Sequence, residues 1–251
     1  MVRRFALAAL ALFVACSLTP RAAASPQDEL KAAAKKVADS SGYAWKAEAE
    51  NVGDAQGPAG TTEGHTQKDG LTHLAIVRGD NTIEAYFNAN GEKGALKMGD
   101  DWKSLAEASE DNGGQPNWGR FITRMIRNFK APATQAMNVA GDIKDLKESE
   151  GGALAGTLTE EGAKELLNFG GRRGGAANAG GDNAGPQVAN AKGTAKFWVK
   201  DGQLAKMEYT VQGTVSFNGN DREINRKTTV EIKDVGSTKV EVPADVKKKM
   251  E

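Results

Sequence analysis

Residues 195–217 read AKFWVKDGQLAKMEYTVQGTVSF, and this stretch decides the fold. Apolar and polar residues alternate on both sides of Asp201-Gly202, which is the pattern of β-strands with one buried face. The Asp-Gly dipeptide favours a tight turn between two antiparallel strands. The sequence therefore predicts a hairpin with strands at about 194–200 and 203–217.

The same alternation continues elsewhere in the chain. Tyr43, Trp45, Ala47 and Ala49 share one face of a predicted strand, and charged residues share the other. Short turn sequences separate the runs that follow, which is typical of an antiparallel meander. Further strands are predicted at 61–67, 71–77, 82–88, 142–148, 153–158 and 222–233, and a last one reaches Val242-Pro243.

Helices are predicted between these strands. Ser25-Pro26 is typical of a helix start, and apolar residues follow at helical spacing to about residue 40. From Trp118 to Phe129, apolar residues fall on one side and arginines on the other, which is the clearest amphipathic helix in the sequence. Shorter helices are predicted up to about Val139, after Thr159 and over 244–251. Together with the meander, they predict an α+β fold.

One segment shows no periodicity. Glycine, alanine and asparagine dominate residues 170–193, so we interpret them as a disordered surface loop inserted into the domain. The strand pattern resumes after the loop, and the chain has no internal repeat. We therefore expect residues 25–251 to form a single domain.

The first 24 residues have the pattern of a secretory signal. Two arginines precede an apolar run from Phe5 to Leu18, and small residues end at Ala24. Cleavage there would leave a mature chain without cysteine and hence without disulfides. Cys16, preceded by Phe13-Val14-Ala15, offers an alternative, since this resembles a lipobox in which the cysteine is acylated. Both readings place the protein outside the cytoplasm, in the periplasm or cell envelope.

Composition and motifs limit the possible functions. Residues 1–24 hold three arginines and no acidic residue, so residues 25–251 hold 30 basic and 33 acidic residues, a net charge of −3. This balance argues against nucleic-acid binding. No Gly-x-Ser-x-Gly motif is present, and the glycines at 170–175 follow a helix rather than begin one, so catalytic and phosphate-binding motifs are lacking. We predict neither an enzyme nor a cofactor.

His65 and His73 are the two histidines of the chain. They flank Lys68-Asp69-Gly70, and a hairpin closed by these three residues would place the histidines opposite each other. With a nearby aspartate they could hold a metal, but a shift of one residue would separate them, and a third histidine or thiol is lacking. We predict no metal site.

The C-terminal part resembles a known family. Residues 195–207, the strand ending in Val215-Ser-Phe-Asn-Gly, the next strand and Val240-Glu-Val-Pro are similar to the bacterial lipoprotein-carrier superfamily of LolA/LolB-like and LppX/LprG-like proteins. Lys97-Met98-Gly99-Asp100-Asp101-Trp102, followed by a helical stretch, is also similar. The lipoprotein carrier itself has an arginine on an early strand. Residues 43–77 contain none, which favours a lipid-binding relative over a lipoprotein shuttle.

The resemblance implies a curved antiparallel sheet, an open half-barrel, with an N-terminal helix and helices over the concave face. It implies a protein that binds a lipid, a lipoprotein acyl chain or another apolar ligand, and we expect it to be a monomer. Trp118 and the three arginines of the amphipathic helix could instead meet a membrane surface of anionic lipid, although an exposed polar face is the commoner explanation. The expected lid helix carries Phe121, Ile122, Met125, Ile126 and Phe129. The alternative is a structural or interaction protein of the envelope with a filled interior. The expected lining of the concave face is Trp45, Ile83, Phe87, Phe197, Met207, Tyr209 and Val211.

Overall fold

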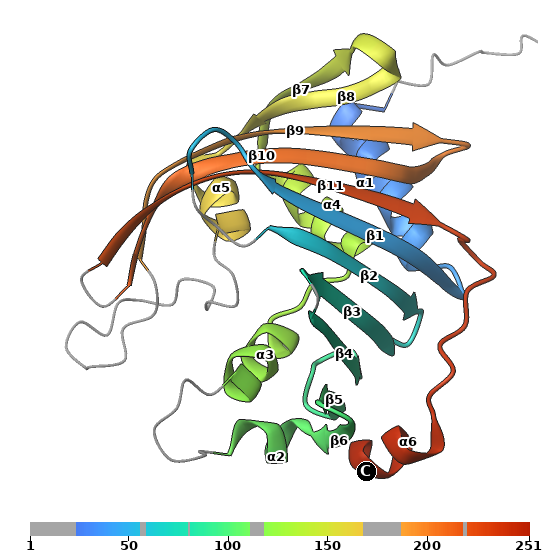
Figure 1. Cartoon of the computed structure of the whole chain (residues 1–251). Helices are drawn as coiled ribbons and strands as arrows, with labels where there is room; N and C mark the ends of the chain where they lie inside the picture. Colours follow the sequence, from blue (N-terminus) through green and yellow to red (C-terminus); the bar gives the residue numbers. More distant parts are fainter. Residues whose placement is uncertain (1–23, 56–58, 80, 111–117, 168–186, 218–219) are drawn as a thin grey trace, which may run out of the picture.

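The computed structural model describes residues 24–55, 59–79, 81–110, 118–167, 187–217 and 220–251. Their strands form one antiparallel sheet of 11 strands, in the order β6-β5-β4-β3-β2-β1-β11-β10-β9-β8-β7. Within these residues the end strands β6 and β7 do not pair with each other, so the sheet is open rather than a closed barrel. It curves strongly, as Figure 1 shows. The predicted α+β fold with a half-barrel sheet is confirmed.

The longest strands lie side by side in the half of the sheet that ends at β7. β9, β10 and β11 each have 14 or 15 residues, and they include the stretch from which the hairpin was predicted. β10 pairs with β9 around Asp201-Gly202, as expected. The strands are β1 (Gly42–Asn51), β2 (Gly60–Gln67), β3 (Thr72–Arg78), β4 (Asn81–Phe87), β5 (Gly94–Met98), β6 (Asp101–Ser104), β7 (Ile143–Ser149), β8 (Ala153–Leu158), β9 (Gln187–Lys200), β10 (Gln203–Phe217) and β11 (Asn220–Lys233).

Helices α1, α3, α4 and α5 lie on the concave side of the sheet (Figure 1). Their apolar residues and the inward residues of the strands form one core cluster, which explains why each helix is amphipathic. None of the described helices is both long and apolar enough to cross a bilayer. The helices are α1 (Pro26–Ala38), α2 (Leu105–Ser109), α3 (Trp118–Arg127), α4 (Pro132–Gly141), α5 (Glu160–Leu167) and α6 (Ala244–Met250), with a short 3-10 turn at Glu150–Gly152.

The opposite, convex face carries a smaller cluster. Tyr86 and Ala95 point away from the main core, and Val240 and Val246 from the C-terminal segment cover them. Lys249 of α6 contacts the Glu107 carboxylate of α2 at 2.9 Å. The C-terminal segment therefore closes the outside of β4–β6.

Two predictions need correction. The last predicted strand, reaching Val242-Pro243, is wrong, because residues 238–243 form no strand and cross the convex face instead. The predicted disordered loop at 170–193 is wrong for residues 187–193, which belong to β9 and pair with β10. Residues 170–186 of that loop lie outside the described residues, as do Cys16 and nearly all of the predicted signal segment.

Candidate functional site

A cavity of about 790 Å³ lies between α3 and the strands β4 and β5. Its floor is the concave face of the sheet near the β6 edge, and its roof is the first half of α3. Apolar side chains make up most of the wall, which suits an apolar ligand better than water. The residues that line it are Thr82, Ile83, Leu96, Lys97, Met98, Gly99, Lys103, Trp118, Gly119 and Ile122.

The side chains of the floor lie on the concave face of the sheet because of strand alternation and register. Ile83 of β4 pairs with Ile76 of β3, and Leu96 of β5 pairs with Ala85 of β4, so these side chains share the concave face. Met98, two residues after Leu96, shares that face and packs only partly against the core. The floor is therefore built from the short strands at one end of the sheet.

The roof is held close to the sheet by α2. Gly119 of α3 lies against Ala108 of α2 so tightly that a Cβ at Gly119 would collide with the Ala108 carbonyl oxygen. The buried Thr123 hydroxyl donates a hydrogen bond to the Leu105 carbonyl oxygen at 3.3 Å. Ile126 is buried one turn further along the helix. These contacts fix the height of α3 above the floor and hence the width of the cavity.

The rim of the cavity combines a cation with an aromatic ring. Lys103 of β6 pairs with Leu96 of β5, so it lies at the concave edge of the sheet. Trp118 begins α3 and is 62% exposed, although it also lines the cavity. An amphiphile with a negative head group and an apolar tail would match this arrangement, with the head near Lys103 and the tail inside.

The structure brings two of the predicted residues to this cavity. Ile83 was expected in the concave lining and Ile122 in the lid helix, and both line the hollow. Leu96, Met98 and Trp118 were missed as cavity residues. The alternation in Gly94-Ala-Leu-Lys-Met could have revealed the first two, but the run is only five residues long.

Trp45 and Phe87 lie instead in an aromatic cluster around Phe129, in which the Trp45 ring is stacked on Phe129 and the Phe87 ring meets it edge to face. Phe129 lies just after α3, and the centroid of its ring is 5.7 Å from that of Trp45 and 5.3 Å from that of Phe87. Gly64 faces Trp45 across the strands, and the indole lies directly over it. This cluster anchors the C-terminal end of α3 to the sheet, so that end of the predicted lid is fixed.

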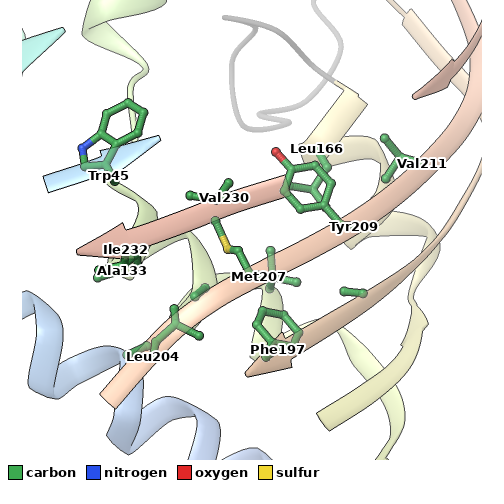
Figure 2. Packing of buried hydrophobic residues seen from close by; sticks show 14 of the residues in the cluster. Trp45, Ala133, Leu166, Phe197, Leu204, Met207, Tyr209, Val211, Val230 and Ile232 are labelled. Carbon is green, nitrogen blue, oxygen red and sulfur yellow. The ribbon is translucent and has the colours of Figure 1, made fainter. Parts of the chain in front are cut away.

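Phe197, Met207, Tyr209 and Val211 point from β9 and β10 into the interior, as Figure 2 shows. Phe197 and Met207 are each 1% exposed, and helices α1 and α5 pack on these strands. None of the four lines the cavity beneath α3. A ligand contact for them stays a prediction, whereas their place in the core cluster is clear.

Arg226 of β11 is buried beside Val211, its partner on β10. Its Nη2 donates a hydrogen bond to the Leu166 carbonyl oxygen of α5 at 3.1 Å. Burial lowers the pKa of the guanidinium to about 10. This residue ties α5 to the sheet.

The five residues predicted for the lid helix differ in how far they are buried. Ile122 and Ile126 are buried, and Met125 and Phe129 pack partly against the core. Phe121 departs from them, because it is 43% exposed and its ring contacts that of Trp118 at 6.0 Å. Its position on the flank of the helix turns it toward solvent.

The histidines lie on the convex face. His65 pairs with His73 across the β2–β3 hairpin and their rings stack at 5.9 Å, so the predicted register is confirmed. His73 Nε2 lies 3.0 Å from Glu84 Oε1, and the Tyr86 ring stacks on the other side. Among the described residues, no group of three or more His, Cys, Asp or Glu side chains could hold a metal ion.

A second hollow of about 750 Å³ lies where the β1–β2 connection approaches the ends of β9–β11. Lys192, Gln212 and Asn225 line it from one row of the sheet, and Asp54 and Glu223 add charge. This wall is mainly polar, so we expect it to hold water. The cavity beneath α3 is the better candidate for an apolar ligand.

No family model matches the chain, and neither does any curated protein. Among solved structures, the chain is similar to LprF from Mycobacterium bovis, with 11% identity, a TM-score of 0.46, and 88% of this chain and 97% of that chain covered. The lipoprotein LppX from Mycobacterium tuberculosis gives 10% identity and a TM-score of 0.46, covering 87% and 98%. A LolA superfamily protein from Nitrosomonas europaea gives 10% and 0.30, covering 84% and 93%. Two of these structures carry the names LppX and LolA, which also denote groups that the C-terminal part of the sequence resembles.

Proposed function

We propose that this protein binds a lipid or another apolar ligand, without catalysis, in the cavity beneath α3. The observation that supports it is a mainly apolar hollow of about 790 Å³ between α3 and the concave face of β4 and β5. Sites for small ligands commonly have volumes of about 300–1,000 Å³ and mostly apolar walls. Ile83, Leu96, Met98 and Ile122 supply that wall.

Hydrophobic transfer would drive binding. Each methylene that leaves water for such a cavity contributes about 0.8 kcal/mol, so a long acyl chain gains on the order of 10 kcal/mol before the entropy of ordering is subtracted. Lys103 at the rim would favour a negatively charged head group. An acylated protein or a free lipid could each supply such a chain.

Mass spectrometry of an organic extract tests the proposal. Protein purified without detergent should release lipid, and delipidated protein should bind added oleate. Ile83→Trp places an indole in the cavity and should abolish oleate binding, whereas Val77→Trp, on the neighbouring strand and 38% exposed, should leave it unchanged. Lipid-free preparations that also ignore oleate would refute the proposal.

Export to the cell envelope is part of the same proposal. It is supported by the basic, apolar and small-residue regions of residues 1–24. The mass of the purified protein should correspond to a chain beginning at Ser25, or to an acylated chain beginning at Cys16. A full-length chain recovered from the cytoplasm would refute export without bearing on the cavity.

A structural or interaction protein of the envelope is the second candidate. It is favoured by the close packing around Phe197 and Met207, each of which is 1% exposed within the core cluster. If the oleate titration shows no binding to wild-type protein, this candidate gains and the first is withdrawn.

A further inference from the structure

The outward side of α3 carries an unusual row of residues. Trp118, Phe121, Arg124 and Arg127 are spaced by three, and each of them is exposed. Residues at this spacing are neighbours on a helix surface, so they form a continuous row, which we name the outer stripe of α3. Two large rings lie at its beginning and two guanidinium groups at its end.

The aromatic half of the stripe is exceptional within the described residues. Among the described residues, four large apolar side chains are exposed. Two of these, Trp118 and Phe121, are neighbours in the outer stripe. The other two are smaller: Val52 lies just after β1, and Val77 lies on β3. Exposed Trp and Phe side chains on a basic amphipathic helix are typical of contact with the lipid-water interface.

The charge of the stripe indicates what kind of bilayer it fits. α3 has the sequence WGRFITRMIR, with three arginines and no acidic residue. Glu107, the acidic residue of the neighbouring helix α2, forms an ion pair with Lys249 at 2.9 Å. Lys103 lies on the same cavity rim as Trp118. A basic helix with aromatic residues complements a surface of anionic lipids.

We propose that the outer stripe of α3 docks this protein onto an anionic lipid bilayer. Trp118 and Phe121 enter the interface, while Arg124 and Arg127 contact the phosphate groups. Trp118 is exposed and also lines the cavity, so docking through Trp118 brings the cavity close to the source of acyl chains. This last point rests on the proposed ligand binding, but docking itself does not require a ligand.

Flotation with vesicles tests the proposal. Wild-type protein should float with vesicles of equal parts phosphatidylcholine and phosphatidylglycerol, and much less with phosphatidylcholine alone. Raising the salt concentration from about 0.1 M to about 1 M should release it, because the Debye length falls from about 10 Å to about 3 Å. Absence of binding, or equal binding to both vesicles, overturns the proposal.

Matched variants locate the surface. The pair Arg124→Gln and Arg127→Gln should weaken binding to the anionic vesicles by about 30-fold. The pair Lys247→Gln and Lys248→Gln removes the same charge from exposed positions on α6 and should change binding by about twofold or less. If both pairs weaken binding equally, the attraction is a property of net charge and the stripe is not the docking surface.

Phe121→Ala should reduce binding about tenfold or more, since it removes a ring from the interface. Phe121, Arg124 and Arg127 do not line the cavity, so these variants should still bind oleate in the absence of vesicles. Docking that fails while oleate binding persists refutes only the docking proposal. Oleate binding that fails while docking persists refutes only the ligand proposal.

Discussion

The two ends of the concave face differ in how completely helices cover them. Over β8–β11, α1 and α5 pack directly on the strands, and Met207 is buried to 1% exposure. Over β4 and β5, α3 is held above the sheet, and Met98 borders a cavity of about 790 Å³. Both methionines point into the concave side from apolar alternation, so the difference lies in the helices above them. The same sheet thus carries a closely packed core at one end and, at the other, the cavity in which we propose that a ligand binds.

The largest expected effect comes from the two methionines themselves. Met207→Ala should lower the free energy of unfolding by about 2–5 kcal/mol, because it opens a void in a closed core. Met98→Ala should lower it by about 1 kcal/mol or less, because its side chain already borders an empty space. Urea denaturation of both variants measures the difference. Equal losses would show that the two ends are packed alike.

Oleate bound in the cavity beneath α3 should stabilise the folded protein. Oleate at 100 times its dissociation constant should raise the free energy of unfolding by about 2.7 kcal/mol. The gain should persist in Met207→Ala and disappear in Ile83→Trp, since only the second change fills the cavity. A gain that persists in Ile83→Trp would place the ligand elsewhere.

The distance between α3 and the floor of the cavity should depend on the contact of α3 with α2. Gly119→Ala forces a methyl group against the Ala108 carbonyl oxygen and should cost about 1–3 kcal/mol of stability. Because the helix must shift, oleate affinity should change as well. Gly141→Ala, in α4 with nothing within 4 Å of the added carbon, is the control and should leave affinity unaltered. Unchanged affinity in Gly119→Ala would mean that α3 does not set the cavity width.

The smallest effect concerns the ion pair that fastens α6 near α2. Lys249 and the Ser104 backbone lower the pKa of the Glu107 carboxylate to about 2 from an ordinary 4.5. Since the folded pKa is the lower one, this stabilisation is complete above pH 4.5 and is lost as the pH falls toward 2. Glu107→Gln should therefore flatten the decline of the urea midpoint between pH 5 and pH 2.5. An identical decline in both proteins would show that the Glu107–Lys249 pair does not contribute to the pH dependence of stability.

The alternating stretches made the sheet predictable. Residues 203–217 alternate over a long run, and the result is β10, with Asp201-Gly202 as its turn. Trp118 to Phe129 likewise gave α3. In both cases local spacing alone determines the element and its buried face, so no knowledge of distant contacts was needed.

Features that depend on distant contacts were less predictable. Val240 and Val242 alternate like a strand, but β1 and β10 already occupy both sides of β11, so the segment packs on Tyr86 of the convex face. Residues 187–193 have the composition of a loop, yet the length of β10 offers them a partner. Likewise, the apolar patterns around Met98 and Met207 are similar in sequence, and only the placement of helices separates a cavity from a core.

Methyl NMR of delipidated protein labelled at its methionines tests the central claim most directly. During a titration with oleate, the Met98 methyl signal should shift and show contacts to the acyl chain, while the Met207 methyl signal should stay in place. Contacts to Met207 instead, or no response from Met98 at saturating oleate, would contradict a binding site beneath α3.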